Sequence, residues 1–409
     1  MSSSRPPEPV RSRLDLPGRA DHLVLVGALG ILSAVSPMAM DIYLASMPAM
    51  ADDLGASASA VQLTMTTYMV GMAVGQFLLG PVSDVLGRHR LMVAGNVVFL
   101  LSSVAVVLAP GIGTVLALRT LQGVAGAAGV VIARAVVSDI ATGRQAAKLF
   151  SALATITSLA PVVAPLLGGV IATVAPWQVA FWALAGFGLL MLLCSVLVVP
   201  ETLPRSRRRT GGIGAAVAGS RAVLRNGPFM AWALVFGLSF GTLFSYVSAS
   251  SFVVQNVLGY SALAYSAVFA VNAAGMIAAA LTNARLVDRV DPAVVLRTAL
   301  TVLAAVTVVG LGLVLAGITG WTTLAQLFVV QTCVGFVMGN ATALAQERVP
   351  GRAGAGSAVL GLVQFLLGGL VSPLSGIAGQ HTAVPMAVLM AGCAVLALGA
   401  AVVATRLSR

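Results

Sequence analysis

The sequence predicts an all-α membrane protein with twelve transmembrane helices in two pseudo-symmetric halves of six helices each. Of its 409 residues, 59% are hydrophobic and only 9% are charged, whereas a soluble domain typically carries about 25% charged residues. A crossing helix needs about 20 residues, and the hydrophobic stretches with their breaks fit twelve of them. A net charge of +11 would favour nucleic-acid binding in a soluble protein, but here the charges lie in short loops between hydrophobic stretches. Nucleic acid is therefore excluded as a partner.

The hydrophobic stretches follow one another with short breaks, and the longest break divides them evenly. We predict spans at residues 22–48, 58–80, 91–109, 112–138, 146–173, 177–199, 229–251, 261–282, 293–316, 319–345, 354–377 and 383–405. Residues 1–21, rich in serine, proline and arginine, predict a disordered cytoplasmic segment. Residues 200–228, rich in arginine, predict a cytoplasmic linker between an N-terminal half (22–199) and a C-terminal half (229–405). Two similar halves around a central site are a common plan of transporters.

Basic residues predict the orientation of these spans. Of the 23 lysine and arginine residues, Arg119 and Arg134 lie deep in the fourth span, and the other 21 lie outside the predicted spans or within the first few residues of one. These 21 lie in segments that alternate to one side, and the positive-inside rule makes that side the cytoplasm. We therefore expect a multi-pass protein of the inner (plasma) membrane with both termini cytoplasmic. The three cysteines stand singly in apolar runs, so we expect no disulfide framework, metal site or cofactor.

Two charged residues stand out at membrane depth. Asp41 lies within the first hydrophobic stretch, about nine residues below its outer end at Met50, and Arg119 lies about seven residues below the outer end of the fourth span. At 1.5 Å per residue the two have similar depth, and a buried arginine needs a carboxylate or several backbone carbonyls. We therefore expect Asp41 and Arg119 to pair or nearly pair. The alternative is a shorter first span that leaves Asp41 in the outer interface.

Polar residues are sparse in the other spans and suggest a largely apolar pocket with a few hydrogen bonds. Gln122 shares the polar, small-residue side of the fourth span with Arg119, whereas Asp139 falls on the opposite side. The alternative for each polar residue is a helix–helix contact. The candidate substrate-binding residues are Tyr43, Gln62, Thr66, Tyr68, Gln122, Phe244, Tyr246, Asn272 and Gln364.

Proline and glycine mark two spans. In the first span, Pro37 shares one helix face with Ser33 and Asp41 and is expected to free a backbone carbonyl and kink the helix. The fifth span contains a second group, which allows a bend and close contact with a neighbouring helix: Pro161, Pro165, Gly168 and Gly169.

Four motifs in the expected order give the chain a resemblance to a known family. Residues 80–90, GPVSDVLGRHR, resemble the major facilitator signature G-x-x-x-D-x-x-G-R-[RK]-[RK], and residues 119–123, RTLQG, resemble its fourth-span motif R-x-x-Q-G. Residues 164–169, APLLGG, resemble the antiporter motif G-P-x-x-G-G, with Ala164 in place of the first glycine. Residues 41–44, DIYL, are similar to the D-M-Y-L of the bicyclomycin/chloramphenicol-resistance branch of drug:proton antiporters.

The resemblance implies roles for these residues. Asp41 would be the proton-coupling carboxylate, with Arg119 tuning its protonation. Arg88 would pair with Asp139, and Asp84 would sit against the start of the eleventh span near Gly354, which together would lock an outward-facing state. The residues expected to control conformation are Gly80, Asp84, Gly87, Arg88, Arg90 and Asp139, and those of the antiporter motif are Pro161, Pro165, Gly168 and Gly169.

The resemblance also implies a function. We expect a monomeric transporter, not an enzyme, that uses protons to export small amphipathic drugs, such as bicyclomycin- or chloramphenicol-like compounds, across the lipid bilayer by alternating access. The alternative, which Ala164 leaves open, is a proton-coupled carrier for an endogenous metabolite or amino acid, working in export or uptake.

Overall fold

The computed structural model describes residues 19–141, 143–204, 206, 208, 221–350 and 352–407, and within these residues the regular structure is helical. Most of the predicted N-terminal segment and of the predicted linker lie outside the described residues. The first half contains α1 Arg19–Ser33, α2 Val35–Asp41, the 3₁₀ turn η1 Leu44–Ser46, α3 Met47–Asp53, α4 Ala58–Leu86, α5 Arg88–Val107, α6 Ile112–Ile140, α7 Gly143–Val174 and α8 Gln178–Leu197.

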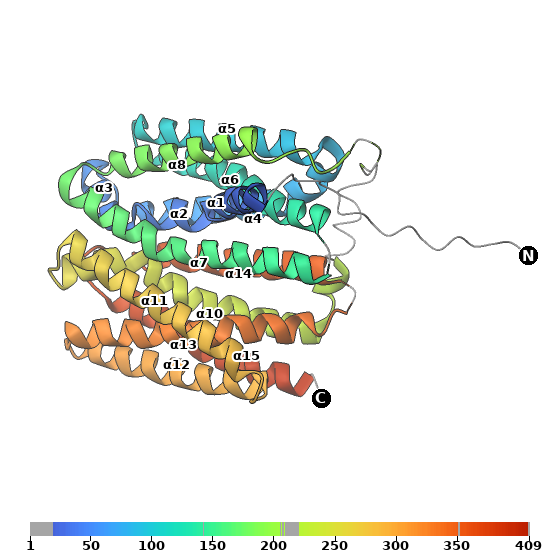
Figure 1. The fold of residues 1–409 in the computed structure, drawn as a ribbon. Coiled ribbons are helices and arrows are strands. Elements are labelled where there is room, and N and C mark those ends of the chain that lie inside the picture. The colour runs from blue at the N-terminus through green and yellow to red at the C-terminus, as the bar shows by residue number, and fades with distance from the viewer. Residues whose placement is uncertain are drawn as a thin grey trace, which may run out of the picture.

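The second half has a similar set of long helices. It contains α10 Gly227–Phe252, which continues as the π-helical turn η3 Val253–Val257, and then α11 Ala262–Leu286, α12 Pro292–Leu315, α13 Trp321–Gln346, α14 Ala353–Leu374 and α15 Val384–Leu407. In Figure 1 the first half lies above the second, and the long helices run side by side between two ends.

The described residues contain 11 helices that are long and apolar enough to cross a membrane, or 12 if one bent pair counts as a single span. The bent pair is the predicted first span, in which residues 23–33 and 35–53 meet at 41°. Proline has no N–H, so Pro37 cannot donate to the carbonyl of Ser33, and the helix breaks there. The predicted kink is therefore present, one turn before the proline itself.

Small residues let the helices of the first half approach closely. A Cβ added at Gly123 of α6 would collide with the backbone carbonyl of Tyr68 in α4, and one at Gly71 of α4 would collide with the carbonyl of Thr120 in α6. Such reciprocal small-residue contacts let membrane helices pack backbone to backbone. The pair α4–α6 therefore forms the packed centre of the first half.

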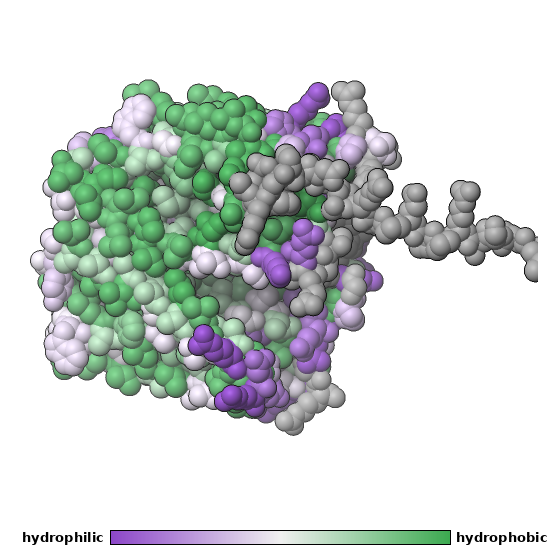
Figure 2. All heavy atoms as spheres, viewed as in Figure 1, coloured by the Kyte–Doolittle hydropathy of each residue, from purple (hydrophilic) through white to green (hydrophobic). Residues whose placement is uncertain are grey.

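The two ends of the bundle differ in charge. One end, which we call the basic end, carries Arg88, Arg90, Arg285, Arg289 and Arg348. The opposite end carries the turns at residues 54–57, 108–111, 259–261 and 316–320. Figure 2 shows hydrophilic side chains gathered at the right-hand end, a hydrophobic surface over most of the visible face, and a hollow between the two halves near the hydrophilic end.

Candidate functional site

A cavity of about 210 Å³ lies between the two halves, and Asp41 is in its wall. The first half contributes the end of α2 and one proline of α7, and the second half contributes α10, α11, α13 and α14. The wall is mostly apolar and aromatic, as in ligand sites that hold a small amphipathic molecule. Its residues are Ser36, Pro37, Met40, Asp41, Pro161, Phe240, Leu243, Phe244, Val247, Phe269, Ala273, Met276, Gln331, Gln364 and Phe365.

Asp41 is the last residue of α2 and is only 7% exposed. The chain continues beyond it through η1 and α3 toward the opposite end, so the structure places Asp41 inside the bundle and not at an outer rim. Among the described residues, no salt bridge reaches its carboxylate. A carboxylate in such a place is costly when ionised and unpaired.

Aromatic rings form the wall that faces Asp41 from the second half. Phe240 stacks on Phe244 with ring centroids 4.4 Å apart and meets Phe365 edge to face at 6.4 Å. Gln331 and Gln364 add polar groups to the same wall. The Oε1 atom of Gln331 is buried without a hydrogen-bond partner, and a buried polar atom in this condition is available to a ligand.

Arg119 forms no salt bridge with Asp41, so the direct pair that the sequence predicted is wrong, while the near-pairing that it also allowed stays a prediction. The Arg119 guanidinium lies 4.8 Å from the ring centroid of Tyr43 and 4.5 Å from that of Tyr68, a cation–π arrangement. It donates to the backbone carbonyl of Ala39 at 2.9 Å and also bonds the Gln122 amide oxygen. Carbonyls, an amide and two rings thus satisfy this buried cation without a carboxylate, while Asp41 faces the cavity.

Several predicted substrate-binding residues belong to this arginine cluster instead of the cavity wall. Gln122 is fully buried, accepts from Arg119 and donates to Ser103 at 2.7 Å. The Tyr43 hydroxyl lies 2.8 Å from that of Thr64. Neither Gln122 nor Tyr43 lines the cavity around Asp41; both surround Arg119, which in turn holds the Ala39 carbonyl of α2.

Two more predicted substrate-binding residues join the halves at the opposite end. Gln62 donates to the carbonyl of Ser248 at 3.1 Å, and Thr66 donates to the carbonyl of Gly369 at 2.8 Å. Every hydrogen bond found between the halves in the described residues lies near this end, and we call this group the inter-half seal. It comprises Ala45, Ser59, Gln62, Thr66, Ser248, Gln255, Gly369, Ser372, Pro373 and Ser375.

Of the nine predicted substrate-binding residues, Phe244 and Gln364 line the cavity directly. Tyr246 and Asn272 form a hydrogen bond of 3.0 Å behind its wall, where Tyr246 stacks on the cavity residue Phe269 at 5.5 Å. Sequence reasoning missed Phe240, Phe269 and Phe365. The i, i+4 spacing of Phe240 and Phe244 on one helix was a usable signal, because it places both rings on one face.

The residues of the predicted antiporter motif lie where α7 meets the cavity and the other half. Pro161 lines the cavity with Asp41. A Cβ added at Gly168 would collide with the carbonyl of Ile42, the residue after Asp41, and one at Gly169 would collide with Ser266 of α11. Pro165 is buried one turn after Pro161. The glycines therefore bring α7 against both the Asp41 segment and the second half.

The basic end contains an ion-pair cluster around Arg88. Its guanidinium lies 2.7 Å from Asp84 and 3.1 Å from Asp139, and its backbone N–H donates to Glu201 at 3.0 Å. Thr202 also donates to Asp139, at 2.9 Å. The Arg88–Asp139 contact implied by the resemblance is present. Glu201 and Thr202, which follow α8, complete the cluster.

The other conformation-controlling residues implied by the resemblance lie around this cluster. Gly87 joins α4 to α5 with φ = +101°, a backbone conformation that favours glycine. Gly80 lies in α4, where an added Cβ would make only an ordinary van der Waals contact with α6. Arg90 is exposed. In the described residues no hydrogen bond or ion pair joins Asp84 to the start of α14; its partner is Arg88. The implied contact with Gly354 is absent from this conformation.

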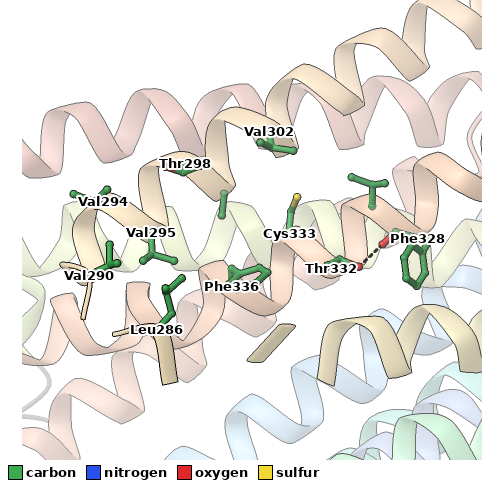
Figure 3. A pocket seen from close by; sticks show the side chains of 12 residues that line it. Leu286, Val290, Val294, Val295, Thr298, Val302, Phe328, Thr332, Cys333 and Phe336 are labelled. Atoms are coloured by element: carbon green, nitrogen blue, oxygen red, sulfur yellow. Dashed lines mark hydrogen bonds between the residues drawn. The ribbon is translucent and has the colours of Figure 1, made fainter. Parts of the chain in front are cut away.

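A larger cavity of about 450 Å³ lies apart from Asp41, between α11, α12 and α13. Figure 3 shows its apolar side chains, including Leu286, Val295 and Phe336, on those three helices. Its residues belong to the second half alone and include no charged group. Volume alone therefore does not mark the candidate site, whereas the carboxylate and the position between the halves do.

Comparison with known proteins gives this architecture a family. Residues 29–373 match the model of the Major Facilitator Superfamily. The chain belongs to the major facilitator superfamily. It is therefore a multi-pass membrane transporter and not an enzyme, and the predicted fold class is confirmed.

Its relatives agree with the resemblance found in the sequence. The chain is 38% identical over 382 residues to the uncharacterized MFS-type transporter YdgK of Bacillus subtilis (strain 168), covering 93% of this chain and 95% of that one. It is 30% identical to a bicyclomycin resistance protein homolog of Haemophilus influenzae, covering 92% and 94%. It is 29% identical to the multidrug resistance protein MdtL of Klebsiella pneumoniae (strain 342), covering 88% and 91%.

A solved structure shares the fold. A bacterial homolog of the human lysosomal transporter Spinster, in an inward-facing and occupied conformation, superposes with a TM-score of 0.73 over 95% of this chain and 98% of that chain. The two sequences are 14% identical, so this likeness concerns the arrangement of the helices alone.

Proposed function

We propose that this major facilitator protein exports small amphipathic drugs, such as bicyclomycin- or chloramphenicol-like compounds, in exchange for protons. One observation carries the proposal: a buried carboxylate, Asp41, lies in an aromatic cavity between the two halves. Relatives that are named for bicyclomycin and multidrug resistance support the choice of substrate class.

The basic end would face the cytoplasm. Loops rich in arginine and lysine stay on the cytoplasmic side of membrane proteins, and the described loops at this end hold Arg88, Arg90, Arg285 and Arg289. The inter-half seal then closes the outer side. The hydrogen bonds found between the halves among the described residues gather at the opposite, sealed end, which supports an inward-facing conformation.

Proton exchange at Asp41 would drive the change of access. When the carboxyl is protonated, enclosing it in an apolar cavity costs much less than enclosing the ion. The protonated form would therefore permit closure of the empty cavity, and an ionised Asp41 would require either water or a bound substrate. Substrate and proton compete for one small space, which is the condition for exchange transport.

Aromatic and amide groups would bind the substrate. Phe240, Phe244 and Phe365 offer stacking surfaces for an apolar or aromatic body. The unpartnered Gln331 carbonyl oxygen accepts a hydrogen bond from a hydroxyl or amide of the ligand. Such a wall accepts many amphipathic compounds, because most of its contacts are apolar and few are directional.

Reconstituted Asp41→Asn protein tests this function. We expect it to lose chloramphenicol-driven proton movement in proteoliposomes while keeping the thermal unfolding midpoint of the wild type. The matched control is Asp52→Asn, since Asp52 is an exposed carboxylate beyond the same span. Normal coupled transport by Asp41→Asn would refute the role of Asp41.

The sign of the flux distinguishes export from uptake. The compartment opposite the basic end is made more acidic than the compartment that the basic end faces. An antiporter then moves substrate toward the acidic compartment. A proton-coupled uptake carrier moves it away from that compartment. Accumulation on the basic-end side would therefore replace our proposal with the metabolite-carrier alternative.

A further inference from the structure

Arg134 is a second cation within the membrane-spanning length of α6, and the proposed proton exchange does not use it. It is exposed although its helix is long and apolar. In the described part of the chain, no hydrogen bond or ion pair is found for its guanidinium. Arg119 on the same helix is by contrast fully buried and satisfied. A charge at this depth is costly and is most often functional.

Two cavities flank Arg134, and it lines both of them. One, of about 240 Å³, separates it from α4 and α14 and includes Gln76 and Ser357. The other, of about 430 Å³, separates it from α1 and α7 and includes Ser33 and Ser158. Neither cavity has an aspartate or glutamate among its described lining residues. Hydroxyl and amide groups line the cavities beside the cation, and no described carboxylate forms an ion pair with it.

This cation lies on the way to Asp41. Ser33 lines one of the cavities that contain Arg134, and Asp41, on the far side of the bend after Ser33, lines the central cavity. On α6, Arg134 lies 15 residues closer to the basic end than Arg119, which corresponds to about 22 Å along a helix. A compound that entered from the basic end would therefore meet Arg134 about four helical turns before it reached the level of Arg119 and Asp41.

An acidic group fits the chemistry of this place best. The planar guanidinium donates two parallel hydrogen bonds to a carboxylate or similar oxyanion. The neighbouring Gln76 and Ser357 supply further donors, since the Ser357 hydroxyl only accepts a hydrogen bond, from Gln346. A cationic compound would instead be repelled, since no carboxylate lines either cavity.

We propose that Arg134 recognises an acidic group, so that the transporter takes amphipathic acids as well as neutral drugs and binds an acid more tightly than its neutral or cationic counterpart. The inference rests on the proposed export function, because it defines the substrate class of the same pathway. The acidic group binds at Arg134, and the apolar body of the compound lies against the apolar side chains of the same cavities, such as Phe77, Phe150 and Leu362.

Binding of two matched probes tests the inference without transport. The protein is placed in neutral-lipid nanodiscs, and isothermal titration calorimetry measures the affinity for 2-naphthoate and for 2-naphthamide, which share a ring but differ in charge. We expect the wild type to bind the carboxylate about tenfold more tightly, the effect of one partly hydrated charge pair. Arg134→Gln should abolish this preference, and Arg134→Lys should retain part of it.

The matched control is Arg297→Gln, which removes the same charge from an exposed site at the basic end of α12. It should leave the preference unchanged. Equal affinities of the wild type for the two probes, or an undiminished preference in Arg134→Gln, would overturn the inference. A preference lost equally in Arg297→Gln would assign it to net charge and would also overturn it.

The result is independent of proton coupling, since no gradient is applied. Failure of the Asp41→Asn test with a clear preference at Arg134 would reject antiport and keep the acid site. The reverse outcome would reject the acid site and keep antiport. If Arg134→Gln does not fold, the wild-type preference and its retention in Arg134→Lys still decide the question.

Discussion

Removal of one side chain should open the inter-half seal. Gln62 is 1% exposed and makes two side-chain hydrogen bonds to the other half. It donates to the carbonyl of Ser248 at 3.1 Å and accepts from the hydroxyl of Ser375 at 3.3 Å. Gln62→Leu keeps a side chain of similar size but removes both bonds. At about 1 kcal/mol net for each bond, the sealed state loses about 2 kcal/mol, a shift of about 30-fold in the ratio of the two states.

Distances between spin labels measure this shift. Labels at Asp52 in the first half and His381 in the second, both exposed at the sealed end, are attached in a background in which the three native cysteines are alanine. Double electron–electron resonance should give one short distance for the wild-type seal and an added longer distance for Gln62→Leu. The longer population should grow because the halves separate at this end.

A hydrogen bond within one half provides the control. Gln178 donates to Asp53 at 3.2 Å near the same end, and both residues belong to the first half. Gln178→Leu should therefore leave the distance distribution unchanged. An unaltered distribution in Gln62→Leu would show that the seal does not set the balance between states, and the reasoning from the six hydrogen bonds would be wrong.

Three further substitutions probe other parts of the structure. Gly123→Ala should lower the free energy of unfolding by about 1–3 kcal/mol through overpacking, whereas Gly392→Ala, with nothing within 4 Å of its Cβ position, should not; thermal unfolding in detergent compares them. Arg119→Lys should lower the free energy of unfolding by about 2–4 kcal/mol, because a lysine cannot reproduce the planar contacts; the same assay measures it, and an unchanged midpoint would contradict the cluster. Arg88→Ala should slow turnover about fivefold, as the loss of an ion pair of about 1 kcal/mol predicts. The ranking of substrates by transport rate should stay the same, and liposome transport rates for several compounds check both.

The positions of the helices could be predicted because hydropathy and helix length act locally. Eleven of the predicted spans each correspond to one long helix, and the first corresponds to a bent pair whose break lies one turn before Pro37. The Arg88–Asp139 contact came from the family resemblance, and the structure contains it at 3.1 Å. These features could be predicted because they depend only on the extent of single helices and on a known motif.

The candidate site could be predicted only in part, because it depends on which helices meet. Depth along the membrane placed Asp41 and Arg119 at one level, but depth does not fix the direction of a side chain. The rings of Tyr43 and Tyr68 occupy the space around the guanidinium. Likewise, Gln62 faces α10 and α14 because α4 lies at the border between the halves. No periodicity within α4 contains that information.

The missing ion pair between Asp41 and Arg119 suits the proposed proton exchange. Arg119 donates to the carbonyl of Ala39, two residues before Asp41, and so it fixes the backbone of α2 and leaves the carboxylate of Asp41 unpaired. A direct salt bridge would hold that carboxylate ionised through the cycle, since breaking a buried pair costs about 3–5 kcal/mol. A carboxylate without such a partner can gain and lose a proton as its surroundings become dry or wet. Under the proposed function, the cluster around Arg119 would therefore provide rigidity close to Asp41 without suppressing proton exchange there.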